Sequence, residues 1–516
     1  MADEPTTVSE LVVTAPRKRS RTGGTKLYRP QISVVLKKNI ARTEAGEGAG
    51  ASERFSGAKG EIDLTPYLGE GSSVTVSKSC RSPTGAFAIN FPDIMEPSAL
   101  DSIYGLVEPM DVIEIRMARD VSEVDAGVPK RMPIMMRGFV NRVQRQTGIS
   151  RDGPQRTVSI SGHDYGKILQ IMQIVYLPNM VLGQELLSSF KLFLNYGVDA
   201  EANQPAGEFV QTVLDKVVNP FLAKMRTAAG RAVESPILDL TLESLVEEGV
   251  VSPFGAQDWP GGTIYDLLSH FGDVGPWNEL YVEDRESGPY LVYRPTPFRT
   301  LGGDMIQTAA FTYTVDVLDS DLVFKSDARS DDSVANYFWV DAPRLALVDS
   351  ALMKVAAQEG QMKPEPFLVD YKNSSPELYG IRLMQTATQQ GARTDGQSEA
   401  KLEAANGVFI GMVNEKRRVL TENNKDNVVL EDGGLRLMGN ERIRAGCYVR
   451  LTRGGEGDNF ESEHYAHEVV HEFTPFTGAY FTTVSYDRGT GFVRRIDRGG
   501  SGPYLAELNL KGSYGE

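Results

Sequence analysis

One pattern in this chain could support hydrolytic chemistry. His467-Glu468-Val469-Val470-His471 is a formal match to the zinc-protease motif H-E-x-x-H. In that chemistry two histidines bind one zinc ion and the glutamate acts as the base. His464 lies just upstream, so three of the five histidines of the chain fall within eight residues. The motif requires a helix, because a helix places residues i and i+4 on one face a single turn apart.

The residues around this motif predict a strand instead. Its centre is a pair of β-branched valines, and Thr474-Pro475-Phe476-Thr477-Gly478 breaks the chain soon afterwards. In a strand, residues four apart lie about 13 Å from each other, which is too far for one metal. No H-x-x-G-x-x-H extension follows, and few acidic residues remain downstream to supply a third ligand. We therefore expect exposed polar positions on a strand, and an H-E-x-x-H-type zinc metalloprotease is the alternative function.

Other signatures of catalysis are missing from the sequence. There is no G-x-x-x-x-G-K-[ST], no G-x-G-x-x-G after a strand, and no G-x-S-x-G. The aromatic residues have the spacing of a protein core, which does not favour a platform for stacking bases. The sequence therefore predicts a protein that is not an enzyme, with no catalytic, cofactor-binding or metal-ligating residue and no cofactor.

The elements around the histidine motif form a pattern that occurs twice. Residues 112–117, 138–143 and 156–161 alternate apolar and polar side chains between Gly-, Pro- and Asp-rich loops, which is typical of half-buried strands. The same order recurs near the C-terminus. Val107, Ile113 and Ile115 lie over Ile443, Val449 and Leu451; 139–143 lies over 469–473; and 157–160 lies over 483–486. This predicts a duplicated β module, although any two β meanders share some likeness.

Length and composition limit the possible classes. A chain of 516 residues is too long for one core, so we expect three or four domains. Its 41% hydrophobic and 24% charged residues are those of a globular protein. The net charge of −15 disfavours binding to nucleic acid or to an anionic membrane. Cys80 and Cys447 are the only cysteines; two free thiols is the simpler expectation, and one disulfide is the alternative.

No apolar run has the length of a signal peptide or of a membrane span, which needs about 18 residues. We therefore expect the protein to be made and folded in a cytoplasm.

The rest of the chain divides by composition. Residues 1–25 end in the basic run Arg17-Lys18-Arg19-Ser20-Arg21 and predict a disordered tail, a peg for an acidic neighbour or a weak nucleic-acid contact. Strands follow to about residue 165. Helical periodicity then appears at 183–196 and at 206–229, where Pro220 must kink or split the helix. The remaining predictions are a helix after Gly261-Gly262, a hairpin at 280–295, strands at 311–317 and 334–340 with an acidic turn at 326–333 between them, and a helix at 398–422.

Four segments resemble one protein family. They are 28–34; 106–115 with 137–140 and 159–164; 277–282 with 293–298; and 439–446. In these segments the chain resembles the central baseplate hub of long-tailed bacteriophages, the group that includes the late control protein D type. The segments span most of 26–490, and the likeness is structural in kind.

The resemblance implies a specific architecture and function. Such hubs are homotrimers in which each subunit contributes two tail-tube-like β-barrels, so that three subunits match the hexameric tail tube above and carry the threefold spike below. The implied partners are the tail tube protein, the spike or tip protein, other baseplate proteins and the tape measure protein. DNA would only pass through the lumen, and no stable membrane insertion is expected. The implied location is the tail baseplate of the virion, assembled in the host cytoplasm.

The predicted fold is thus α+β and mainly β, with two tail-tube-like antiparallel β-barrels and a mixed α/β domain between them. Another tail component with the same barrel, a distal-tail or tube-terminator protein, is a further alternative. The predicted ranges are a basic tail at 1–25, the first barrel at 26–170, the mixed domain at 171–310, the second barrel with the 398–422 helix at 311–490, and a C-terminal tail at 491–516.

Overall fold

The computed structural model describes residues 28–39, 61–94, 102–120, 132–150, 153–177, 180–182, 204–228, 235–246, 249–251, 262–307, 312–341, 371–391, 399–452 and 460–497. The predicted tail over 1–25 and the helix predicted over 183–196 lie outside these residues.

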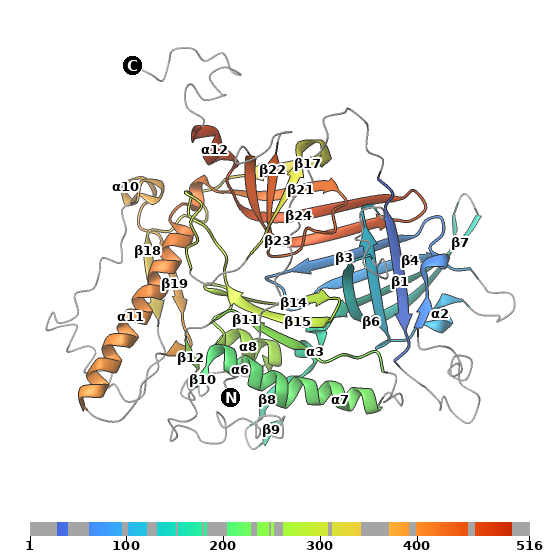
Figure 1. Cartoon of the computed structure of the whole chain (residues 1–516), viewed down its shortest axis with the longest axis horizontal. Coiled ribbons are helices and arrows are strands. Elements are labelled where there is room, and N and C mark those ends of the chain that lie inside the picture. The colour runs from blue at the N-terminus through green and yellow to red at the C-terminus, as the bar shows by residue number, and fades with distance from the viewer. Residues whose placement is uncertain are drawn as a thin grey trace, which may run out of the picture.

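The described chain is α+β and mainly β, as predicted, and a sheet of 13 strands dominates it (Figure 1). The strands follow the order β2-β1-β5-β6-β7-β4-β3-β23-β24-β21-β17, and β22 pairs with β23 and with β16. Every pair is antiparallel except β16 with β22. Among the described residues these strands form an open sheet, so the two predicted closed barrels are not present there.

The sheet consists of two modules, which we name by their order in the chain. The first module contains β1 (Gln31–Lys37), β2 (Glu61–Asp63), β3 (Ser73–Ser79), β4 (Ala86–Pro92), β5 (Val112–Ala118), β6 (Ile134–Ser150) and β7 (Gly153–Asp164), with the short helices η1 (Thr65–Tyr67) and α2 (Ile103–Leu106). The second module contains β16 (Thr314–Leu318), β17 (Leu322–Ala328), β21 (Glu431–Met438), β22 (Tyr448–Thr452), β23 (Phe460–Thr474) and β24 (Ala479–Gly489), with η5 (Asp319–Asp321), η7 (Asn427–Val429) and α12 (Gly491–Asp497).

Both modules have the same strand order. The first runs β1-β5-β6-β7-β4-β3 and the second runs β16-β22-β23-β24-β21-β17. Each strand of one therefore has a counterpart in the other, with β6 matching β23 and β3 matching β17. The one difference is that β1 runs antiparallel to β5, whereas β16 runs parallel to β22. The duplicated order of the last three strands, which the sequence predicts, is confirmed, and it extends to six strands.

Alternation along these strands buries one face in each module. Val34, Ile89, Ile115 and Ile160 are fully buried in the first core. Leu435, Val449 and Val484 are fully buried in the second. Two features differ from expectation. Residues 322–328, partly assigned to an acidic turn, form β17, and the start of the predicted C-terminal tail forms α12.

The segment between the modules is a mixed α/β region with its own core, which packs against Val112 and Phe139 of the first module. Its helices are α3 (Gly166–Ile171), α6 (Ala206–Val213), α7 (Asn219–Ala228) and α8 (Ile264–Phe271), and its strands are β8 (Gln173–Leu177), β9 (Met180–Leu182), β10 (Gln204–Pro205), β11 (Thr241–Ser244), β12 (Val250–Val251), β13 (Gly262–Thr263), β14 (Asn278–Arg285) and β15 (Gly288–Pro295). A π-helical turn, Leu214–Val218, joins α6 to α7 just before Pro220. The predicted disruption of this helix is therefore confirmed, because proline has no N–H to donate.

A long helix, α11 (Glu399–Asn424), lies where the sequence predicts one and runs along one side of the molecule in Figure 1. The Trp277 indole donates to the Lys416 carbonyl at 2.9 Å and ties this helix to the mixed region. Smaller elements beside it are β18 (Tyr337–Asp341), β19 (Leu383–Ala387), β20 (Gln390–Gly391), η6 (Lys372–Ser374) and α10 (Pro376–Tyr379). No helix of the described residues is both long and apolar enough to cross a membrane.

Candidate functional site: the seam between the two modules

The two modules are joined by a strand pairing within the chain. The first half of β23 pairs with β22, and its second half, Glu468–Phe473, pairs with Val74–Ser79 of β3. Phe473 and Tyr480 of the β23–β24 hairpin are buried in the core of the first module. We call this pairing the in-chain seam. It makes one continuous sheet out of two modules that are far apart in the sequence (Figure 1).

The strand ladders give a residue-by-residue match between β6 and β23. Each strand has one bulge against its hairpin partner, at Asn141 in β6 and at His467 in β23. Phe139 faces Val112 across the first module, and Tyr465 faces Tyr448 across the second. Phe139 therefore corresponds to Tyr465. The predicted match of 139–143 to 469–473 is therefore wrong by four residues. The match of 157–160 to 483–486 is wrong by two, because Ile160 corresponds to Val484. The match of 107–117 to 443–453 is confirmed.

A shared backbone conformation just before β5 and β22 supports this match. Met110 and Gly446 are equivalent, and both have positive φ, at 73° and 82°. The Met110 N–H donates to the Val140 carbonyl at 2.9 Å, and the Gly446 N–H donates to the Ala466 carbonyl at 2.7 Å. In each module the residue after the positive-φ position accepts the return bond from the same partner, at 2.8 and 2.9 Å. The two modules therefore share this local conformation, which is uncommon for a non-glycine residue such as Met110.

One equivalent pair has exchanged its charges between the modules. In the first module Glu114 of β5 faces Arg137 of β6, with 3.3 Å between carboxylate and guanidinium. In the second module Arg450 of β22 faces Glu463 of β23 at 2.9 Å. Burial opposes ionisation of Glu114, but its cationic neighbours outweigh burial and lower its pKa to about 2.

A second equivalent pair has exchanged an aromatic ring and a glycine. Phe87 of β4 faces Gly162 of β7 in the first module, whereas Gly433 of β21 faces Tyr486 of β24 in the second. A Cβ at Gly162 would lie 2.5 Å from the Phe87 ring. Each module thus has one aromatic ring facing one glycine. The ring is on β4 in the first module and on β24, the counterpart of β7, in the second.

The histidine motif lies on β23, as the strand prediction requires. His464 and His471 are buried, so the expectation of exposed polar positions is wrong for these two. Nε2 of His471 is 3.1 Å from the Ile443 carbonyl, and its Nδ1 is 3.0 Å from the Tyr480 hydroxyl. Burial lowers the pKa of each of these two histidines to about 3, so both are neutral at pH 7. No group of three potential metal ligands occurs among the described residues.

The motif therefore does not have the helical geometry on which zinc-protease chemistry depends. A strand with a bulge at His467 carries it, and its last histidine is engaged in the seam. His467 itself contributes its carbonyl to the seam, accepting from the Cys80 N–H at 3.0 Å.

A buried polar cluster lies where both modules meet the mixed region. Arg294 of β15 pairs with Glu279 of β14 at 3.0 Å and donates to the Gly446 carbonyl at 2.8 Å. The Tyr465 hydroxyl donates to Glu279, and the Cys80 sulfur is 3.6 Å from the same hydroxyl. Burial raises the pKa of the Cys80 thiol well above its usual value. Cys80 and Cys447 are both free and buried, so the expectation of two free thiols is confirmed.

A second buried charge fastens the first module to the mixed region. Lys78 of β3 pairs with Asp164 at 2.5 Å and with Asp284 at 2.8 Å. Both carboxylates are fully enclosed. Because buried charges are tolerated only when they are paired, this contact and the cluster around Arg294 fix how the three parts are oriented.

Each module also contains one strand segment that takes no part in the in-chain seam, although its counterpart in the other module does. In the first module the counterpart of Glu468–Phe473 is Arg142–Thr147 of β6. These residues pair with β7 on one side, and β5 pairs only with the earlier part of β6. In the second module the counterpart of β3 is β17, which pairs with β21 alone. Within the described chain, both segments have a strand partner on one side only.

Comparison with known proteins gives structural neighbours but no sequence family. No protein-family model matches the chain, and no curated protein matches it. The 43 kDa tail protein of prophage MuSo2 from Shewanella oneidensis has a TM-score of 0.40 and 11% identity, over 88% of this chain and 96% of that one. The tail protein from Neisseria meningitidis MC58 has a TM-score of 0.39 and 9% identity, over 88% and 96%. An Escherichia coli component of the type VI secretion system, described as similar to T4 bacteriophage tail proteins, has a TM-score of 0.36 and 7% identity, over 80% and 72%. The first two of these neighbours are phage tail proteins, and the third is likened to phage tail proteins in its own description.

Sequence reasoning predicted no site residues, and it missed the features that make the seam. The apolar start of β17, Leu322-Val323-Phe324, is a strand signal that the acidic turn after it obscured. The exchanged pairs Glu114–Arg137 and Arg450–Glu463 could be found only after the bulges had fixed the match.

Proposed function

We propose that this chain is a structural protein of a bacteriophage tail, the homotrimeric central hub of its baseplate, and not an enzyme. In this proposal the hub joins the hexameric tail tube to the threefold spike and forms part of the channel through which DNA passes. The tail tube protein, the spike or tip protein, other baseplate proteins and the tape measure protein are its proposed partners. The virion baseplate is its proposed location.

The in-chain seam is the observation that carries the proposal. The seam pairs β3 of the first module with β23 of the second. By the match of the modules, the same joint can form once more, between β17 of one copy and Arg142–Thr147 in β6 of the next. This second joint is a head-to-tail contact, and head-to-tail contacts close into rings when the rotation allows.

Three copies joined in this way would place six equivalent modules around an axis. A ring of six matches the hexameric tube that the sequence resemblance implies, while the mixed region and α11 occur once per chain and would keep threefold symmetry. The division of the chain into two tube-like domains, 26–170 and 311–490, with the mixed domain between them is part of this proposal.

The register of the second joint follows from the first. In the in-chain seam His471 faces Val76, and Val470 faces Ser77. The equivalent residues place Arg145 opposite Asp327 of the neighbour and Gln144 opposite Ala328. The charges at the first of these positions are complementary, and cross-strand pairs of opposite charge favour a register.

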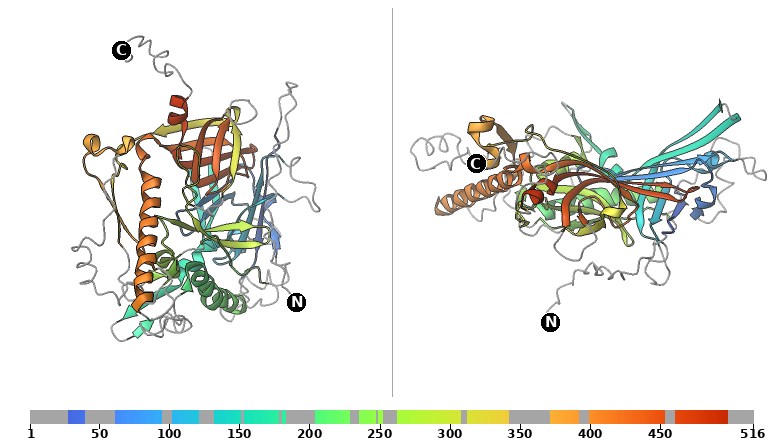
Figure 2. Two further views of the ribbon diagram at one scale, coloured as in Figure 1. Left: turned by 60° about the vertical axis from the view of Figure 1, so that its left-hand side comes forward. Right: turned by 90° about the horizontal axis from the view of Figure 1, so that it is seen from above.

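The shape of β6–β7 fits this role. In the right-hand view of Figure 2 the hairpin, coloured teal, extends past the rest of the sheet. Ile149 near its tip is 91% exposed. An extended strand with a free edge is a ready template for pairing with another chain.

The oligomeric state and symmetry of the purified chain test the proposal. We expect native mass spectrometry to give a trimer, and electron microscopy to give a threefold particle with six similar lobes around a channel. A chain that stays monomeric or dimeric at micromolar concentration would overturn the hub. A ring of six chains would favour the tube-terminator or distal-tail alternative. Stoichiometric zinc, lost on His467→Ala, would favour the metalloprotease.

A further inference from the structure

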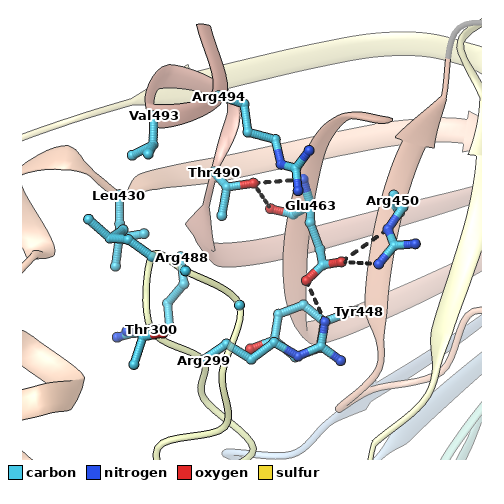
Figure 3. Close-up of a pocket in the computed structure, with 13 residues that line it drawn as sticks. Arg299, Thr300, Leu430, Tyr448, Arg450, Glu463, Arg488, Thr490, Val493 and Arg494 are labelled. Atoms are coloured by element: carbon cyan, nitrogen blue, oxygen red, sulfur yellow. Dashed lines mark hydrogen bonds and ion pairs between the residues drawn. The ribbon is translucent and has the colours of Figure 1, made fainter. Parts of the chain in front are cut away.

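The second module contains a pocket of about 520 Å³ that the proposed trimer does not use (Figure 3). It lies between the loop after β15, the polar face of β22 and β23, and the start of α12. Four arginines and one glutamate line it: Arg299, Arg450, Arg488, Arg494 and Glu463. The pocket is therefore a concentration of positive charge in a chain whose net charge is −15.

The single carboxylate of the pocket is already shared. Glu463 pairs with Arg299 at 2.7 Å and with Arg450 at 2.9 Å. Arg450 also lies 3.9 Å from Asp316, an exposed residue outside the pocket lining. The Glu463 carboxylate thus has little capacity left for a further cation.

Arg488 makes no ion pair within 4.0 Å with any carboxylate of the described residues. Its guanidinium lies 4.3 Å from the centre of the Phe298 ring and donates to the Asn423 carbonyl. Its backbone has a φ of 59°, the left-handed region that favours glycine. Asp487 and Asp426 act on it only through longer-range charge, and burial lowers its pKa. An arginine thus occupies a position where glycine would be less strained.

The equivalent face of the first module is balanced. There Lys37, Arg116 and Arg137 surround Glu114, and two further carboxylates complete the set. Glu61 pairs with Lys37 at 3.1 Å, and Glu286 from the β14–β15 hairpin pairs with Arg116 at 2.7 Å. Three cations therefore meet three carboxylates. In the second module the positions equivalent to Arg116 and Lys37 carry Thr452 and Thr314, which have no charge. The pocket arginines other than Arg450 come instead from the loop after β15, from the end of β24 and from α12.

We propose that this pocket binds a small polyvalent oxyanion of the phosphate class, held by the guanidinium groups that line it. Planar guanidinium groups match phosphate oxygens through paired hydrogen bonds. The Thr300 and Thr490 side chains also line the space, and its volume lies in the range of small-molecule sites. The site lies within one chain and does not depend on the proposed trimer.

Calorimetric titration of the purified full-length chain with inorganic pyrophosphate at fixed ionic strength tests the proposal. We expect one site per chain and a higher thermal midpoint in its presence. Arg488→Gly removes the guanidinium while relieving the strained backbone, so this variant should stay folded and bind about tenfold more weakly or worse. Glu463→Gln removes the competing carboxylate and should bind more tightly.

Arg436→Gln is the matched control. Arg436 lies on β21 of the same module, is 41% exposed and pairs with Glu472 at 2.9 Å. This variant should bind pyrophosphate as the parent chain does. No binding by the parent chain would overturn the proposal, and so would an equal loss in Arg436→Gln and Arg488→Gly, since that result would mean general attraction to positive charge.

Discussion

A disulfide across the proposed joint between copies would test its register. The variant carries Gln144→Cys in β6 and Ala328→Cys in β17. Their counterparts in the in-chain seam, Val470 and Ser77, are directly opposite each other. Facing residues in an antiparallel pair have Cα atoms about 4.5–5.5 Å apart, within the 4.4–6.8 Å span of a disulfide.

Within one chain the same two cysteines cannot meet. Seven strand spacings separate β17 from β6 along the sheet, through β21, β24, β23, β3, β4 and β7. At about 4.8 Å per spacing, this is about 34 Å along the sheet. Any disulfide between these cysteines therefore joins two copies, and three disulfides would close a ring of three chains.

The assay is mild oxidation followed by non-reducing gel electrophoresis. We expect linked dimers and a closed species of three chains that a reductant dissolves. The native thiols Cys80 and Cys447 are buried and stay in place. Val470→Cys with Ser77→Cys is the positive control, and it should link within one chain without increasing the mass.

The register is tested by moving one cysteine. Val323 lies on β17, five residues before Ala328, which is about 17 Å along a strand. Gln144→Cys with Val323→Cys should stay unlinked. Equal linking by both pairs, or none by Gln144→Cys with Ala328→Cys while the positive control links, would refute the reasoning.

Three further predictions concern the stability of the folded chain. Lys78→Met leaves two enclosed carboxylates without their cation, so the free energy of unfolding in urea should fall by about 3–5 kcal/mol, and a loss below about 1 kcal/mol would contradict the contact. The folded pKa of His471 is about 3, below the usual value near 6.5, so the unfolded chain binds the proton first and stability is lost as pH falls from about 6.5 to 3. Urea titrations across this range should show that His471→Gln removes up to about 1.4 kcal/mol per pH unit from the slope, and an unchanged slope would mean that His471 is not the buried neutral base described. Gly162→Ala would place a Cβ against the Phe139 carbonyl, so thermal unfolding should show a loss of about 1–3 kcal/mol. Gly148→Ala, with open space around it, should change little, and equal effects of the two substitutions would contradict the packing.

The sequence predicted the strands well where one face is buried and the other is polar. The alternation of Ile113, Ile115 and Met117 marked β5, and the same period marked β22. The period of two is also the reason for the four-residue error between β6 and β23, because shifting a strand by an even number keeps its apolar face inward. Only the bulges at Asn141 and His467 fix the match, and a bulge has no distinct residue signature in either strand.

The buried histidines and the seam were beyond sequence reasoning for a different reason. His471 is enclosed because β3, from a segment almost 400 residues away, pairs beside it. A polar residue can be buried when the partners for its polar atoms arrive from elsewhere, here the Ile443 carbonyl and the Tyr480 hydroxyl. Local pattern alone assigns such a residue to solvent.

The continuous strand pairing from β3 to β23 also bears on how a ring of this kind could be assembled. Of six joints between modules, three would already be closed when each chain finishes folding, at an effective concentration set by the connecting polypeptide and not by the number of copies in the cell. Only three encounters between separate molecules would remain. The joints within each chain would also make first and second modules alternate around the axis. A ring could then not be built from copies of one module alone.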